Sequence, residues 1–176
     1  MPAGAHEAKH PKRAALRLTP ERIVLQLELA VAPGEPARGL RAALGGEKLA
    51  DHLARTAALP VKLWIDGAQV PLARGPASVE DRGEIVGRVE LSAPWPPGSG
   101  DWLGRRRLRI EDEGPAGAGH VPVAVSCSGC AISSSSGGVF HRDAHLVEHV
   151  VGAQMSREAP LEVRVRIGRP GLSCGG

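Results

Sequence analysis

The stretch 23-IVLQLELAV-31 has the most regular pattern of the chain, with an apolar residue at every odd position. The even positions include Gln26 and Glu28, so apolar and polar side chains alternate with a period of two. That period is typical of a β-strand that buries one face. A shorter apolar segment at 15–18 precedes it across a turn at 19–21, and the two segments together predict an opening β-hairpin.

Similar patterns recur along the chain, separated by loops rich in glycine and proline. The further predicted strands cover 61–65, 70–72, 85–91, 107–110, 121–125 and 161–167. Asp66-Gly67 lies between the first two of these and is a strong signal for a tight hairpin. About eight short strands with short connections predict a mainly β fold, an antiparallel β-sandwich of the immunoglobulin-like kind.

Two segments have helical spacing instead. Residues 36–58 place leucines at positions 40, 44, 49 and 53, and Gly45-Gly46 interrupts the series, which predicts a helical insertion of two short helices. A further helix is predicted at about 143–154, in the C-terminal half of the chain.

The length of 176 residues fits one domain. We expect a flexible lead-in at 1–13, a single β-sandwich domain at 14–168 and a tail at 169–176. Hydrophobic residues make up 42% of the chain and charged residues 23%, which is typical of a folded domain and excludes a wholly disordered one. The chain has one Phe, three Trp and no Tyr, so its core must be aliphatic.

The formal net charge of +3 is modest for this length. The basic run at 105–109 has no Phe or Tyr near it, so we interpret it as a solvated strand face and do not predict nucleic-acid binding. No stretch of about 20 apolar residues is present, so no membrane span is predicted. No signal peptide is visible at the N-terminus, and these features alone leave the localisation open.

Side chains of the types that bind transition metals gather between positions 127 and 155. On the predicted helix, three histidines spaced by four residues lie within about 80° of one another, on the side opposite the apolar residues. We therefore expect an exposed histidine stripe that binds zinc or another divalent transition metal, although no cofactor is certain. The candidate metal ligands are Cys127, Cys130, His141, His145 and His149.

Three more specific chemistries compete for this region. The first is a Cys2His2-like zinc site, since ten residues separate Cys127-x2-Cys130 from His141-x3-His145. The second is redox chemistry, because Cys-x-x-Cys can form a disulfide couple; residues 129–133 also resemble the cysteine loop of iron–sulfur scaffold proteins.

The third chemistry is hydrolytic. His145-x-x-Glu148-His149 resembles the motif of inverted-motif zinc peptidases of the pitrilysin and insulinase type. The resemblance implies that the two histidines hold zinc and that Glu148 activates a bound water as the catalytic residue of a zinc-dependent hydrolase. That family needs a further glutamate ligand far downstream, and the nearest later acids here are Glu158 and Glu162.

A purely structural interpretation stands beside these. In it Cys127 and Cys130 flank a tight turn, the histidines form a solvated face, and the chain is an uncharacterised structural domain with no ligand.

A resemblance covers more of the chain, at about residues 5–126. Its segments are 5–7, 31–34, 63–72, 102–110 and 121–125. They resemble the extracytoplasmic β-domain of nickel-transporter-like membrane proteins of the hydrogenase and urease accessory type. The resemblance implies a periplasmic or secreted domain, with Ala5-His6 similar to the mature end left by signal cleavage.

In that family, membrane helices follow the domain, but none is predicted here, so the transport activity is not carried over. We therefore expect a non-enzymatic, extracytoplasmic accessory domain that acts in protein interaction or metal handling, with a protein partner. Edge strands of a sandwich can pair with a partner, and we expect Arg164 and Arg166 to mark such a strand.

Overall fold

The computed structural model describes residues 11–97, 104–114 and 119–167, which form twelve strands in two sheets and two helices. In spatial order, the seven-stranded sheet comprises β10 (Val139–Arg142), β11 (Glu148–Met155), β8 (Val121–Cys127), β1 (Lys12–Leu18), β2 (Arg22–Val31), β6 (Glu84–Pro94) and β5 (Ala73–Arg82). The five-stranded sheet comprises β4 (Ala68–Val70), β3 (Val61–Ile65), β7 (Arg105–Asp112), β12 (Leu161–Ile167) and β9 (Cys130–Ser135). The predicted mainly β sandwich is therefore confirmed.

The core lies between the two sheets and is aliphatic. Leu16 and Leu25 from the seven-stranded sheet and Leu63, Ile110 and Val163 from the five-stranded sheet belong to one buried cluster, each at most 1% exposed. Their positions follow from the period-two alternation, because successive side chains of a strand point to opposite faces.

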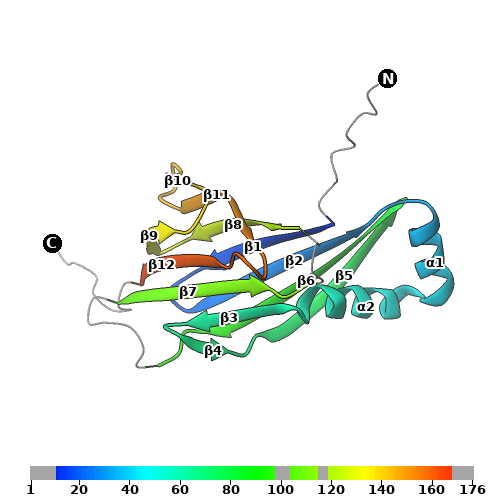
Figure 1. Cartoon of the computed structure of the whole chain (residues 1–176), viewed down its shortest axis with the longest axis horizontal. Helices are drawn as coiled ribbons and strands as arrows, with labels where there is room; N and C mark the ends of the chain where they lie inside the picture. The colour runs from blue at the N-terminus through cyan, green and yellow to red at the C-terminus, as the bar shows by residue number, and fades with distance from the viewer. Residues whose placement is uncertain (1–10, 98–103, 115–118, 168–176) are drawn as a thin grey trace, which may run out of the picture.

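The predicted helical insertion is present as α1 (Glu35–Ala43) and α2 (Gly46–Ala58). The helices pack on the same face of β2 and β6 as the second sheet, but farther along these long strands (Figure 1). Strands β2, β5 and β6 have 10 or 11 residues, whereas the five-stranded sheet has strands of 3 to 8, so part of the longer sheet would otherwise be uncovered. Gly87 permits the close contact, because a Cβ there would lie 2.6 Å from the Cβ of Leu53.

The strands predicted from the alternating segments are all present, with β4 two residues earlier than expected. The opening hairpin pairs β1 with β2 in antiparallel register, and the turn between β3 and β4 contains Asp66 and Gly67, both with positive φ. One pair departs from the antiparallel prediction, since β1 and β8 run parallel.

The helix predicted at 143–154 is wrong. Residues 143–147 form a turn, and β11 follows from Glu148 to Met155. The valines of this segment suit the pleated surface of a sheet, where β11 pairs with both β8 and β10. Gly152, with a φ of 82°, lies where the register with β8 shifts between Val150 and Ala153, a position that a regular helix could not contain.

Two boundaries and one strand position also differ from expectation. Strand β1 begins at Lys12, inside the predicted lead-in, while residues 1–10 and the predicted tail at 169–176 lie outside the described residues. Strand β12 lies between β7 and β9, so the prediction that Arg164 and Arg166 mark an edge strand is wrong. No helix in the described ranges is long and apolar enough to cross a membrane.

Candidate functional site

The two candidate cysteines, Cys127 and Cys130, lie where the chain passes from one sheet to the other. Cys127 ends β8 and is fully buried, and Cys130 begins β9 in the opposite sheet. Their sulfur atoms form a disulfide, with the Cα atoms 5.6 Å apart, a separation that falls in the usual disulfide range. Gly129, with a φ of 72°, completes the tight turn, and the N–H of Ser128 donates to the carbonyl of Leu18. In this oxidised form the sulfurs are not thiolates and cannot serve as metal ligands.

The structure brings two of the three candidate histidines together, on neighbouring strands rather than on a helix. His141 of β10 is directly opposite His149 of β11, and their rings stack with centroids 5.1 Å apart. His145 is exposed in the turn between these strands. The histidine stripe expected on a helix therefore does not form, because the helix itself is absent.

Asp143 organises this turn. One carboxylate oxygen, Oδ1, accepts hydrogen bonds from the backbone N–H groups of His145 and Val147, and Oδ2 lies 3.1 Å from Nε2 of His149. The pKa of Asp143 is lowered from its ordinary value, chiefly by the hydrogen bond with His149 and less by the two backbone donors. The group therefore acts as a capping carboxylate for the β10–β11 turn.

Glu148 is buried, with only 3% of its surface exposed. Its carboxylate forms an ion pair with Arg142 of β10 and accepts a hydrogen bond from the backbone N–H of Ile132 in β9. It thus joins three strands, including one from the opposite sheet. The helix that holds the zinc ligands of inverted-motif peptidases is absent over these residues, and both oxygens of Glu148 already have protein partners.

Within the described ranges, no three or more His, Cys, Asp or Glu side chains are grouped so that they could hold a metal ion. The structure therefore does not bring His141, His145, His149, Cys127 and Cys130 together as one ligand set.

A surface feature that the sequence interpretation missed lies on the same hairpin. Five large hydrophobic side chains of the described residues are exposed, and four of them are on the β10–β11 hairpin. They are Val139 (73% exposed), Phe140 (49%), Leu146 (73%) and Val151 (56%). Because Val139 and Val151 are directly opposite, their side chains share one face of the hairpin. The sequence signal was only the short apolar pair at 139–140, which cannot be distinguished from a buried segment by pattern alone.

No family model and no curated protein matches this chain. The fold defines a two-sheet β-sandwich protein with a helical insertion.

Proposed function

We propose that this chain is a non-enzymatic interaction domain that works outside the cytoplasm and binds an extended segment of a partner protein along strand β10. The observation that carries the proposal is the gathering of exposed apolar side chains on the β10–β11 hairpin. Single exposed apolar residues are ordinary, but Val139 and Val151 are cross-strand neighbours, and a contiguous apolar patch marks an interaction site.

Strand β10 is also the edge of the seven-stranded sheet as described. An edge strand offers unpaired backbone N–H and C=O groups, and a partner can add a strand to it while its alternate side chains contact the neighbouring surface. Val139 and Val151 would supply that apolar contact, and burying each such side chain contributes about 1.5–3 kcal/mol.

Leu146, in the turn of the same hairpin, also favours a binding role for this hairpin. It combines 73% exposure with a φ of 61°, a left-handed conformation that is uncommon for leucine. Both features are unfavourable in the isolated domain, and such local strain is often retained where a residue is used in binding.

The extracytoplasmic location is supported by the disulfide between Cys127 and Cys130, because disulfides persist mainly in oxidising compartments. It also agrees with the resemblance to the extracytoplasmic β-domain of nickel-transporter-like accessory proteins. The test is acid quenching and alkylation of the protein in its native cells, followed by mass spectrometry of the 127–130 peptide. Unmodified, disulfide-linked cysteines are expected, and two alkylated thiols would contradict the location.

Strand addition at β10 can be tested with displayed peptide libraries selected on the purified domain. We expect enriched peptides with alternating apolar residues, whose binding is lost in Val139→Lys. Ala77→Lys, in β5 at the opposite edge of the same sheet, is the matched control and should bind as the wild type does. Enrichment of no peptide, or equal binding to both variants, would contradict the proposal.

Metal handling, which the resemblance also implies, has the stacked His141–His149 pair as its basis. Two imidazoles are a partial ligand set for zinc or nickel, so water or the partner would supply the rest. Calorimetric titration with zinc, nickel and copper should show weak binding that His149→Ala abolishes. His52→Ala on α2 is the control, and equal binding by the two variants would argue against this role.

A further inference from the structure

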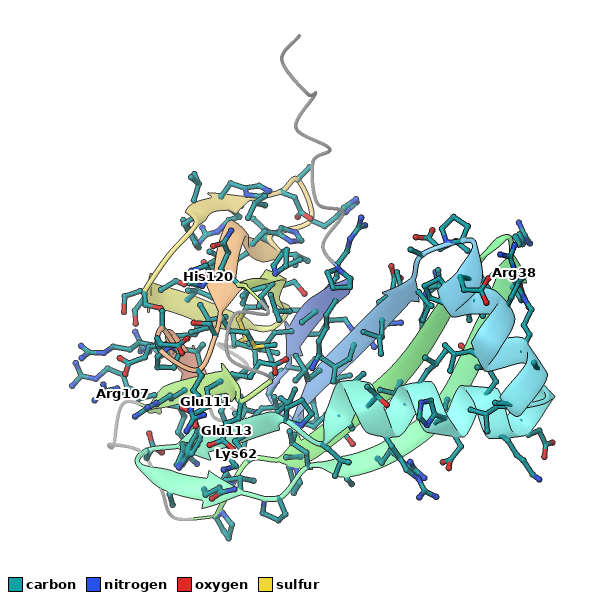
Figure 2. All side chains as sticks on the ribbon, turned by 45° about the vertical axis from the view of Figure 1, so that its right-hand side comes forward. Arg38, Lys62, Arg107, Glu111, Glu113 and His120 are labelled. Atoms are coloured by element: carbon teal, nitrogen blue, oxygen red, sulfur yellow. A yellow bond between two sulfur atoms is a disulfide. The ribbon has the colours of Figure 1, made fainter. Side chains whose placement is uncertain are left out.

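The outer face of the five-stranded sheet carries positive side chains from three adjacent strands. They are Lys62 of β3, Arg105, Arg107 and Arg109 of β7, and Arg164 and Arg166 of β12. The inward positions between them, such as Leu108 and Val165, are completely buried. Figure 2 labels Lys62, Arg107, Glu111 and Glu113, which lie along this side of the molecule.

Four of these arginines form two opposed pairs on neighbouring strands, and we call them the arginine quartet: Arg105, Arg107, Arg164 and Arg166. Arg107 is directly opposite Arg164, and Arg105 is directly opposite Arg166. Side chains at such positions have Cβ atoms about 4.5–5.5 Å apart, and like charges placed there destabilise a sheet. Each pair therefore places a positive side chain of β12 beside one of β7.

Glu162 supplies a carboxylate to the quartet. Nη2 of Arg107 lies 2.8 Å from both carboxylate oxygens of Glu162. No described residue forms an ion pair with Arg164 or Arg166. The contact between Arg107 and Glu162 shows that this face binds a carboxylate through a guanidinium group, and Arg164 and Arg166 repeat the same chemistry on the neighbouring strand.

The rest of the face is balanced in charge. Arg109 pairs with Glu111 at 3.1 Å, and Lys62 pairs with Glu113 at 2.6 Å. An area of balanced charge does not attract a uniformly negative surface such as nucleic acid or an anionic membrane. A partner whose negative charges are confined to one segment fits better, and protein segments have that property.

The aromatic side chain Trp64 on the described part of this face is poorly exposed for stacking. Trp64 is covered by the guanidinium of Arg109, whose Cζ lies 5.3 Å from the ring centroid, and so is poorly placed to stack with a nucleic-acid base. A cavity of about 240 Å³, lined by Trp64, Gly67, Arg107, Arg109 and Glu162, adjoins the quartet. It has room for one side chain of a bound segment, anchored beside tryptophan and arginine, the residue types that dominate binding energy in protein interfaces.

The distance between arginines on the same strand favours a partner segment in an extended conformation. Residues two apart in a strand are separated by about 6.4–6.8 Å, so Arg105 and Arg107 repeat at this distance, as do Arg164 and Arg166. Alternate residues of an extended peptide repeat at the same distance. We propose that the outer face of the five-stranded sheet binds an extended acidic segment of a partner protein, with Asp or Glu at alternating positions over Arg164 and Arg166 of the arginine quartet. This inference does not depend on strand addition at β10, which lies in the other sheet.

The experiment uses a fluorescent eight-residue peptide of alternating Glu and Thr, with binding followed by anisotropy at low salt. The test variant is Arg164→Gln/Arg166→Gln, and the matched control is Arg13→Gln/Arg22→Gln on the seven-stranded sheet. Both variants remove two positive charges from a net charge of +3, so comparing them separates the loss of the binding site from the loss of overall positive charge. The test variant should bind about 5- to 30-fold more weakly, and the control within about twofold of the wild type.

A peptide of the same composition with four consecutive Glu residues should bind more weakly than the alternating one, because its carboxylates do not share one face. The melting temperature of the test variant should be unchanged or higher, since the cross-strand repulsion is relieved. A lower melting temperature would assign the arginines a structural role and overturn the inference.

Three further outcomes would also overturn it: no peptide binding by the wild type, equal weakening in both variants, or tighter binding of a single-stranded oligonucleotide or of anionic phospholipid vesicles. The last would assign the face to a different class of partner.

Discussion

Glu148→Ala removes a carboxylate that joins β11 to β10 and to β9 in the opposite sheet. The backbone N–H of Ile132, a residue only 9% exposed, would lose its acceptor, and an orphaned buried donor costs about 1–3 kcal/mol. The lost ion pair adds less, about 0–1 kcal/mol, because the side chain of Arg142 is 55% exposed and can return to water. With the loss of side-chain packing, we expect the free energy of unfolding to fall by about 2–4 kcal/mol.

Urea unfolding followed by circular dichroism measures this change. The control is Glu158→Ala, the same chemical substitution at an exposed site, which should alter stability by less than about 0.5 kcal/mol. Glu148→Gln keeps an acceptor oxygen and the side-chain volume, so its effect should lie between the two. If Glu148→Ala proved as stable as the control, the carboxylate would not be a structural link between the strands.

Three other predictions concern the same half of the molecule. Gly138→Ala should lower the free energy of unfolding by about 2–4 kcal/mol in a urea melt, because a Cβ at this φ of 86° would lie 2.6 Å from a valine methyl carbon of β11. Gly137→Ala, whose Cβ would meet nothing within 4 Å, should be neutral, and similar losses in both would contradict the close contact. Reduction of the disulfide between Cys127 and Cys130 should destabilise the domain by about 2 kcal/mol through the entropy of so short a loop, and an unchanged melting temperature with reductant would oppose this. Asp143 has a lowered pKa, so its stabilising contribution is present above about pH 3.9 and is lost as the pH falls through the folded-state pKa. The melting temperatures of the wild type and of Asp143→Asn should therefore converge at low pH. A difference in melting temperature that stays constant with pH would refute this prediction.

Much of the fold could be predicted because strand patterns are local. The alternation at 23–31 and at 161–167 identified strands correctly, and Gly45-Gly46 correctly separated two helices. The exposed strand β5 was missed because it lies at a sheet edge and has no alternating burial. The segment 143–154 was misassigned because apolar residues three and four apart satisfy a helical pattern, while pairing with β8 and β10 favours a strand.

The candidate site was less predictable. The sequence identified His141, His149 and Glu148 as candidate site residues, but their predicted spatial arrangement depended on a helix that does not form. Cross-strand pairing instead stacks the two imidazoles and turns Glu148 toward Arg142 and the N–H of Ile132.

The sequence by itself determined that this protein is a β-sandwich with an aliphatic core. The alternation of apolar and polar residues with a period of two is a local property of each strand, and the scarcity of aromatic residues is a property of the composition. Only the tertiary structure decided which strands became neighbours, and therefore which charges and apolar side chains share a surface. Arg107 and Glu162, for example, are 55 residues apart in the chain and 2.8 Å apart in space. The arginine quartet and the exposed β10–β11 hairpin both arise in this way, since sheet order and register depend on the packing of the whole core.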